Sequence, residues 1–215
     1  VIDADNDFDD LEEVPLFKNS KGDLLFWGNG LIKRNGANRI FNAYAVQATY
    51  FLTEGGSRED ISTETEYTGS VRQTINTTLA HALHEVDDFA WFRAGRNLVE
   101  SSLFSGASYK NYSFKDINST GKEKLTLVFT SNNVSTPLTV TVNDSTLTTT
   151  TIPAPGNYMY FSEKKINNLD VSDFKKEDGT WEIRLSTKGS SSVQGRLDYI
   201  CLNYTSPIEI KDGFI

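Results

Sequence analysis

A series of short alternating segments in the second half of the sequence constrains the fold more than any other feature. Each segment is rich in β-branched and aromatic residues, and each is bounded by Asn, Asp, Gly, Ser or Pro. The segments are 124–130, 137–143, 147–152, 158–161, 181–187 and 197–204. Because no amphipathic helix separates them, the pattern predicts an all-β protein, an antiparallel β-sandwich or jelly roll, and not a parallel α/β sheet.

The first hundred residues are less regular. Leu24–Trp27 and Tyr50–Thr53 are predicted as buried strands, and Thr74–Val86 as the strand that enters the sandwich. One short helix is expected at most, over Asp87–Phe104, with Asp87 or Asp88 as its cap and with Gly95 in its middle weakening it. We expect an acidic arm with an irregular β-rich extension over residues 1–75 and a jelly-roll sandwich over residues 76–215, packed as one unit.

The charge balance excludes some partners. The chain has 21 basic and 29 acidic side chains, a formal net charge of −8, and no basic cluster. Nucleic-acid binding rests on the neutralisation of phosphates by Lys and Arg, so no nucleic-acid partner is expected. No stretch approaches the roughly 18 apolar residues of a membrane span. The sequence opens on Val1 and not on Met, which leads us to expect a mature or excised piece of a protein.

The N-terminal arm is the most acidic segment. Asp3, Asp5 and Asp7 imitate the first half of an EF-hand loop, which offers oxygen ligands at alternate positions. However, Phe8 stands where the turn glycine is needed, and Val14 stands where the bidentate glutamate is needed. A looser calcium contact stays open. We expect a solvated acidic arm, no metal site and no cofactor.

Cys201 is the single cysteine, so the chain has no intramolecular disulfide. A cysteine and a histidine can form a nucleophile and base pair, but Cys201 lies inside a dense strand pattern and not at a glycine-flanked turn. His81 and His84 are three residues apart, so on a strand they point to opposite faces. We therefore expect Cys201 to be a packing residue and the chain to have no catalytic residue.

The three tryptophans are the candidates for ligand contact. Trp181 alternates with apolar neighbours and Trp27 closes an apolar run, so both are predicted to face the core. Trp91 lies beside aromatic residues and two arginines, and we take Trp91, Arg93 and Arg96 as candidate ligand-binding residues.

Asp198 is the one carboxylate in the last predicted strand. Strict alternation puts it on the same face as Ile200 and Leu202, with Leu197 on the other face. A buried charge without a partner costs several kcal/mol, so we expect Asp198 to accept hydrogen bonds from a neighbouring loop.

Several segments, taken in order, resemble the β-rich region that precedes the peptidase domain in PorU-type sortases of the type IX secretion system, which belong to the gingipain family of cysteine peptidases. The segments that carry the resemblance are Phe8–Phe17, Gly22–Gly28, Asn42–Tyr44, Tyr50–Thr53, His84–Asp87, Gly95–Arg96, Phe104, Arg196–Tyr204 and Ile208–Ile215. The sequence departs from the family at Asn97–Glu100, and Cys201 stands where an acidic or polar residue is common.

The resemblance implies a non-catalytic accessory segment. The caspase-like domain of the family, with its catalytic His and Cys, has no counterpart in this sequence, so no catalytic residue is carried over. The implied partners are a peptidase domain of the same parent chain and exported protein substrates. The implied location is the periplasm, or the cell surface or outer membrane, of a Gram-negative bacterium.

Two alternatives share the predicted fold. A carbohydrate-binding module would use an aromatic platform to bind glycans, and jelly-roll modules of that class often end in a strand similar to Leu197–Leu202. A cell-surface adhesin would instead expose a contiguous apolar patch to a protein partner.

Overall fold

The structure is a computed structural model, and it describes residues 14–28, 32–35, 38–41, 47–52, 74–92 and 98–209. The chain divides into two compact units, Val1–Arg72 and Gln73–Ile215. The acidic arm over residues 1–13 lies outside the described residues. Each unit is described by itself.

The first unit contains two antiparallel hairpins, β1 (Leu16–Lys18) with β2 (Leu24–Phe26) and β3 (Ile32–Asn35) with β4 (Asn38–Phe41). The side-chain oxygen of Asn19 closes the first hairpin, since it accepts hydrogen bonds from the backbone N–H groups of Lys21 and Asp23 at 2.9 Å each.

Two predictions for this unit were wrong. Trp27 is 83% exposed and not a core residue, because the short β1–β2 hairpin is too small to form a buried layer of its own. Tyr50–Leu52, the described part of the predicted strand Tyr50–Thr53, has no strand pairing, and the Tyr50 ring instead packs 5.0 Å from the Phe26 ring.

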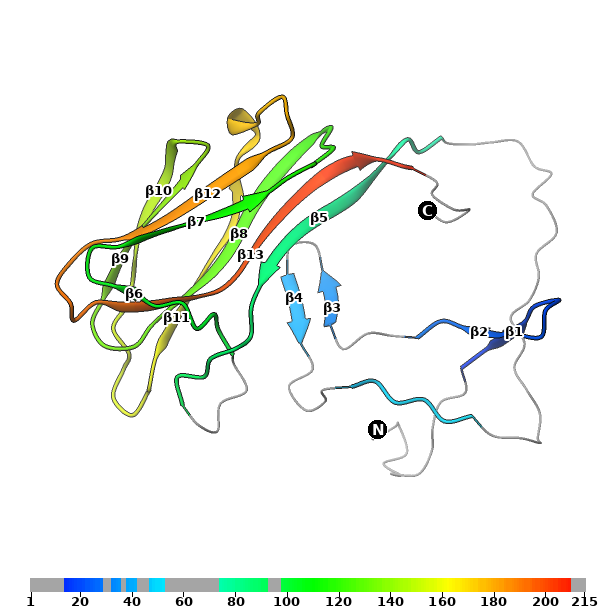
Figure 1. The fold of residues 1–215 in the computed structure, drawn as a ribbon, viewed down its shortest axis with the longest axis horizontal. Coiled ribbons are helices and arrows are strands. Elements are labelled where there is room, and N and C mark those ends of the chain that lie inside the picture. The colour runs from blue at the N-terminus through cyan, green and yellow to red at the C-terminus, as the bar shows by residue number, and fades with distance from the viewer. Residues whose placement is uncertain are drawn as a thin grey trace. The chain divides into compact units, whose positions relative to one another are not determined.

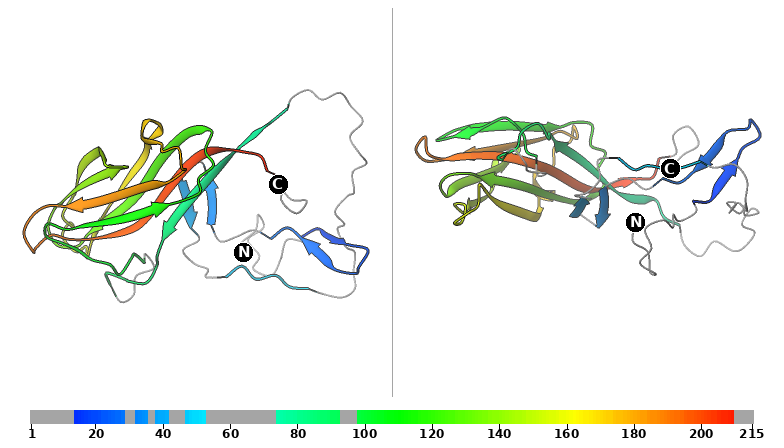
Figure 2. Two further views of the ribbon diagram at one scale, coloured as in Figure 1. Left: turned by 45° about the horizontal axis from the view of Figure 1, so that its top comes forward. Right: turned by 90° about the horizontal axis from the view of Figure 1, so that it is seen from below.

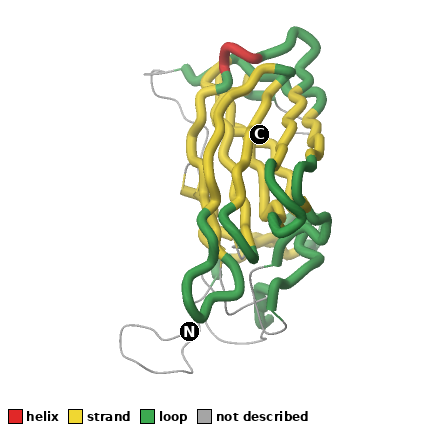
Figure 3. Tube along the Cα trace, turned by 90° about the vertical axis from the view of Figure 1, so that its left-hand side faces the viewer, coloured by secondary structure: helices red, strands yellow, loops and turns green. Residues whose placement is uncertain are grey.

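The second unit is an antiparallel β-sandwich (Figure 1), as the sequence predicted. One sheet has the strand order β10-β9-β12-β7 and the other has the order β11-β8-β13-β5, with β6 also pairing with β13. The strands are β5 (Thr77–Glu85), β6 (Phe104–Ser105), β7 (Tyr109–Phe114), β8 (Gly121–Ser131), β9 (Thr136–Val142), β10 (Ser145–Ile152), β11 (Ser162–Asp170), β12 (Trp181–Thr187) and β13 (Gln194–Pro207). Figures 2 and 3 show the two layers from other sides.

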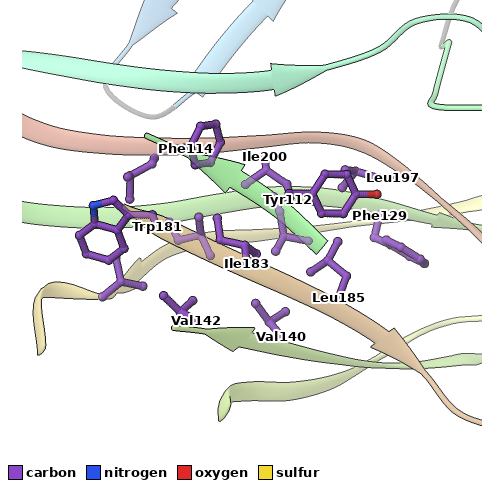
Figure 4. Close-up of a cluster of buried hydrophobic side chains, with 14 of the residues drawn as sticks. Tyr112, Phe114, Phe129, Val140, Val142, Trp181, Ile183, Leu185, Leu197 and Ile200 are labelled. Carbon is purple, nitrogen blue, oxygen red and sulfur yellow. The ribbon is translucent and has the colours of Figure 1, made fainter. Parts of the chain in front are cut away.

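The core lies between the two sheets. Alternate residues of each central strand point inward, as in β12, where Trp181, Ile183 and Leu185 are buried and the residues between them are more exposed. These side chains meet apolar residues of the facing sheet, Phe129, Leu197 and Ile200 among them (Figure 4). The prediction that Trp181 faces the core is confirmed.

β13 is the last described strand, yet it lies inside its sheet, between β8 and β5. Its pairing with β8 shifts between Leu197 and Tyr199, so Asp198 is the extra residue of a β-bulge. The bulge places Leu197 in the main core with Ile200 and Leu202, whereas Tyr199 packs on the other face with Cys201 and Val128. The prediction that Asp198 shares the face of Ile200 and Leu202 assumed unbroken alternation and was wrong.

Asp87–Phe104 does not form the predicted helix. In its described parts, Phe89 and Val99 form an antiparallel bridge, with N–H···O distances of 3.0 and 2.8 Å in the two directions. Residues ten apart in an α-helix are about 15 Å apart along the axis, so this bridge excludes a helix across the segment. A single 3-10 turn, η1 (Ser172–Phe174), is the helical element among the described residues, and no helix there is long and apolar enough to cross a membrane.

The predicted strand over residues 158–161 is also absent. The backbone N–H of Met159 donates to the Gly156 carbonyl at 3.1 Å, and Tyr158 has a φ of 69°. This closes a turn between β10 and β11 with a tyrosine at a position that favours glycine. The Tyr158 side chain is fully exposed, so the aromatic run reflects a surface loop and not a buried strand.

Candidate functional site

Three carboxylates meet where β5 ends beside the bulge of β13. Glu85 pairs with Tyr199, which places it next to Asp198, and Asp87 follows two residues later. One carboxylate oxygen from each of these three residues lies within 4.8 Å of the other two. Carboxylate oxygens are the ligands of hard cations such as Ca²⁺, so these residues are the described ones best placed to hold a metal ion.

Glu100 forms a polar cluster on the inner side of the same region. Its Oε2 atom lies 3.2 Å from His84 Nε2 and accepts a hydrogen bond from the Tyr112 hydroxyl, also at 3.2 Å. Burial, together with the neighbouring Glu100 carboxylate, raises the pKa of Tyr112 far above its ordinary value. The phenol therefore stays protonated and remains a donor to Glu100.

Arg196 connects this cluster to the segment that replaces the predicted helix. Its guanidinium carbon lies 3.7 Å from the centre of the Phe89 ring and 5.0 Å from that of the Trp91 ring. Its Nη1 atom donates to the carbonyl oxygens of Glu100 and Ser101. Burial lowers the pKa of Arg196, while the Asp88 and Glu100 carboxylates oppose that shift. Arg196 thus fixes the backbone around residue 100 against β13.

The structure places one of the three predicted ligand-binding residues. Trp91 is half-buried, its indole N–H donates to Thr130 Oγ1 at 2.9 Å, and its ring packs edge-on against Phe89 with centroids 5.5 Å apart. Arg93 and Arg96 lie outside the described residues. Trp91, Arg93 and Arg96 remain a prediction.

The structure does not bring Cys201 together with either histidine at a site open to solvent. Cys201 is fully buried, and its Sγ atom lies 3.8 Å from Asn203 Oδ1. His84 stands opposite Ile200 on the inner face, whereas His81 stands opposite Asn203 on the outer face. The two histidines therefore point to opposite sides of the sheet, as expected, and the burial of Cys201 agrees with a packing role.

A separate polar pocket of about 310 Å³ lies among the turns that precede β8 and β12. It is lined by Asp116, Ile117, Asn118, Ser119, Lys175, Glu177, Asp178 and Gly179. Below it, the buried Glu123 carboxylate accepts a 2.6 Å hydrogen bond from Ser119 Oγ, and Lys175 Nζ lies 3.9 Å from Glu123 Oε1. Burial by itself would raise the pKa of Glu123, but these contacts outweigh it and lower the pKa.

The lowered pKa of Glu123 predicts an acid-dependent loss of stability. The ionised Glu123 carboxylate stabilises the folded state. This stabilisation is complete above the ordinary glutamate pKa of about 4.3 and is lost as the pH falls through the lower pKa of the folded state. Glu123→Gln should therefore flatten the decline of the free energy of unfolding as the pH falls below about 5. Denaturant titrations across that range check this. Glu177→Gln, an exposed carboxylate at the same pocket, is the control and should keep the wild-type profile.

Sequence reasoning singled out His84, Trp91 and Asp198 separately but missed Glu85, Glu100 and Arg196. These residues meet only because β5 pairs with β13 in one register and because the segment around residue 100 folds back on β13. The sequence carried one usable indication, an acidic pair at Glu85 and Asp87 around the end of the strand predicted over Thr74–Val86.

Comparison with known proteins supports the fold and leaves the family open. No family model and no curated protein matches the sequence. Among solved structures, the chain is similar to dimeric latent PorU from Porphyromonas gingivalis, with a TM-score of 0.66 and 14% identity over 93% of this chain. The match spans only 20% of the PorU chain. A whole-chain likeness at this identity establishes a shared β-rich fold.

Two of the weaker similarities are to carbohydrate-binding modules. A family 35 module from an environmental isolate matches 65% of this chain and 96% of its own, with 15% identity and a TM-score of 0.35. A family 36 module, solved with calcium and xylotriose, matches 57% of this chain and 98% of its own, with 17% identity and a TM-score of 0.36.

Proposed function

We propose that this chain is a non-catalytic accessory region of a larger exported cysteine peptidase of the gingipain family, similar to the sortases of type IX secretion. The observation that carries the proposal is the likeness to PorU over 93% of the chain. The ordered sequence segments that resemble the same proteins support it. In this function the sandwich scaffolds a peptidase domain of the same parent chain or presents exported protein substrates to it.

The chemistry of the described residues supports an accessory role. Cys201 is fully buried on β13, in a cluster with Val128 and Tyr199. A thiolate nucleophile needs access to substrate, and a fully buried thiol in an apolar cluster does not have it. The proposal places the protein in the periplasm or at the cell surface of a Gram-negative bacterium.

The isolated chain is expected to fold and to show no thiol-dependent peptidase activity. Far-UV circular dichroism and cooperative unfolding check the fold, and a panel of fluorogenic peptides checks the activity. Cys201→Ala is the matched variant. Peptide cleavage by the wild-type chain that disappears in Cys201→Ala would overturn the proposal.

An exposed aromatic group favours carbohydrate binding as a second candidate function. The rings of Phe92 and Tyr160 stack 4.2 Å apart at 19°, and the neighbouring Tyr158 is fully exposed. Exposed aromatic rings can pack against the apolar faces of sugar rings. A glycan array tests this function, with Tyr160→Ala as the variant and Tyr109→Ala, an exposed tyrosine on β7, as the control. Absence of binding to any glycan rejects it.

A further inference from the structure

Donor groups from both sheets converge on the Glu100 carboxylate. His84 Nε2 of β5 and the Tyr112 hydroxyl of β7 each lie 3.2 Å from Glu100 Oε2, and the His84 and Tyr112 rings are 4.8 Å apart. The ammonium group of Lys110, also on β7, interacts with Glu100 electrostatically. Lysine and tyrosine donate hydrogen bonds, and histidine donates from Nε2 in one of its neutral tautomers and when protonated. These three side chains therefore have the chemistry of a carboxylate-binding site, and Glu100 fills it with its side chain only 15% exposed.

The same donors depend on one short segment, residues 98–102, which we call the strap. Glu100 lies in the strap, and so does Ser102, whose hydroxyl accepts a hydrogen bond from Lys110 Nζ. Burial lowers the pKa of Lys110, and the Glu100 carboxylate opposes that shift. Each donor of the site thus has a strap residue as a partner, so displacement of the strap frees all three together and leaves them in need of an anion.

The strap is held in place mainly by hydrogen bonds. The Glu100 N–H donates to the Leu197 carbonyl of β13 at 2.8 Å. The Asp88 carboxylate accepts hydrogen bonds from the backbone N–H and the hydroxyl of Ser101, at 2.6 Å each. Val99 is the one fully buried side chain of the strap, and it belongs to neither hydrophobic core cluster of the described residues. Segments with few buried apolar contacts open at a lower free energy than the core, so the strap can open while the two sheets stay packed.

We propose that His84, Lys110 and Tyr112 form a binding site for the carboxylate of a ligand, and that Glu100 blocks this site as a ligand tethered to the chain. The closed strap is then an autoinhibitory contact. The apparent affinity of the wild-type chain is reduced in proportion to the fraction of molecules whose strap is open. The ligand is a peptide that carries a carboxylate, and this part of the inference rests on the proposed function, in which the sandwich presents exported protein substrates.

Chemical rescue tests the site. Glu100→Ala removes the carboxylate and leaves room for a small acid, so acetate should raise the midpoint of thermal unfolding of this variant by about 3–6 °C at roughly ten times its Kd. A Glu100→Ala chain that is unfolded in sodium chloride should instead fold in sodium acetate, which circular dichroism detects. Acetamide, which has the shape of acetate without its charge, should do neither. The control is Glu177→Ala, which removes an exposed carboxylate and should gain nothing from acetate.

Second substitutions identify the donors. In the Glu100→Ala background, Tyr112→Phe removes one donor but keeps the ring, and it should weaken the Kd for acetate by about tenfold. Tyr109→Phe, at an exposed tyrosine of the same strand, is the control and should leave the Kd unchanged. Acetyl-Gly-Gly, with a free C-terminus, and acetyl-Gly-Glu amide, with a side-chain carboxylate, distinguish the two sources of a peptide carboxylate by the tighter of their two Kd values.

Asp88→Ala tests the autoinhibition. It removes both acceptors that Ser101 uses and leaves Glu100 in place, so the strap should open more often and acetate should bind this chain more tightly than the wild type. Asp173→Ala, at an exposed aspartate of η1, is the control. Four results overturn the proposal: an acetate shift as large in the wild type as in Glu100→Ala, a rescue that Tyr112→Phe leaves intact, an Asp88→Ala chain that binds acetate no better than the wild type, or no binding of either peptide. None of them alters the peptidase assay, so this proposal and the proposed function fail separately.

Discussion

Phe129→Ala is expected to lower the free energy of unfolding of the sandwich by about 3–5 kcal/mol. Phe129 is fully buried near the C-terminal end of β8, where it is paired with Lys164 of β11 on one side and Leu197 of β13 on the other. Its ring packs against Phe104 with centroids 5.1 Å apart. Truncation removes this contact and leaves a cavity that the two rigid sheets cannot close. Equilibrium unfolding in urea measures the loss.

The control for this prediction is Tyr160→Ala, which removes an aromatic ring that is 57% exposed. Its cost should stay below about 1 kcal/mol. Gly195→Ala probes the same site from the other side, since a Cβ there would lie 2.4 Å from Phe129 Cε1. Combining it with Phe129→Leu should cost less than the sum of the two single changes. A Phe129→Ala cost as small as that of Tyr160→Ala would contradict the assigned core.

Arg196→Ala is expected to cost about 2–4 kcal/mol, with its largest effect on the segment from Phe89 to Ser101. The change removes the cation–π contact with Phe89 and leaves the carbonyl oxygens of Glu100 and Ser101 without their donor. Arg196→Lys should recover little, because an ammonium group lacks the planar fork that reaches both carbonyls and stacks on the ring.

Amide hydrogen exchange separates the local effect from the global one. The amides of Phe89 and Val99 bond to each other's carbonyls, so their protection reports on this segment. Arg184→Ala is the matched control, since Arg184 is an exposed arginine whose guanidinium also lies over an aromatic ring, 5.0 Å from the centre of the Tyr109 ring. Unchanged protection at Phe89 and Val99 in Arg196→Ala would contradict the role given to Arg196.

The sandwich could be predicted because its strands carry a local pattern. In β12, the inward side chains of Trp181, Ile183 and Leu185 alternate with polar ones, and the predicted and observed bounds coincide. The same local reasoning failed at Tyr158, because high strand propensity of aromatic residues does not show that they stand in an exposed turn. It failed again at Asp198, since a single bulge reverses the faces that alternation predicts.

The candidate site could not be predicted because it depends on contacts between distant segments. The predicted helix over Asp87–Phe104 had a cap and apolar spacing, but the Glu100 N–H donates to the Leu197 carbonyl at 2.8 Å, and Arg196 holds the carbonyl groups that follow. These interactions join residues nearly a hundred positions apart. The helix propensity of the segment contributes less free energy than this set of hydrogen bonds and therefore does not decide its structure. The carboxylates of Glu85, Asp87 and Asp198 likewise meet only through the register of β5 on β13.

The position of β13 has a consequence for how this protein is made. Among the described residues β13 is the last strand, but β5 and β8 each need it as a neighbour. A growing chain that has not yet released residue 207 cannot complete the five-stranded sheet, and its core stays open until then. The sandwich therefore folds only once the chain has been released as far as residue 207, and not strand by strand as it emerges.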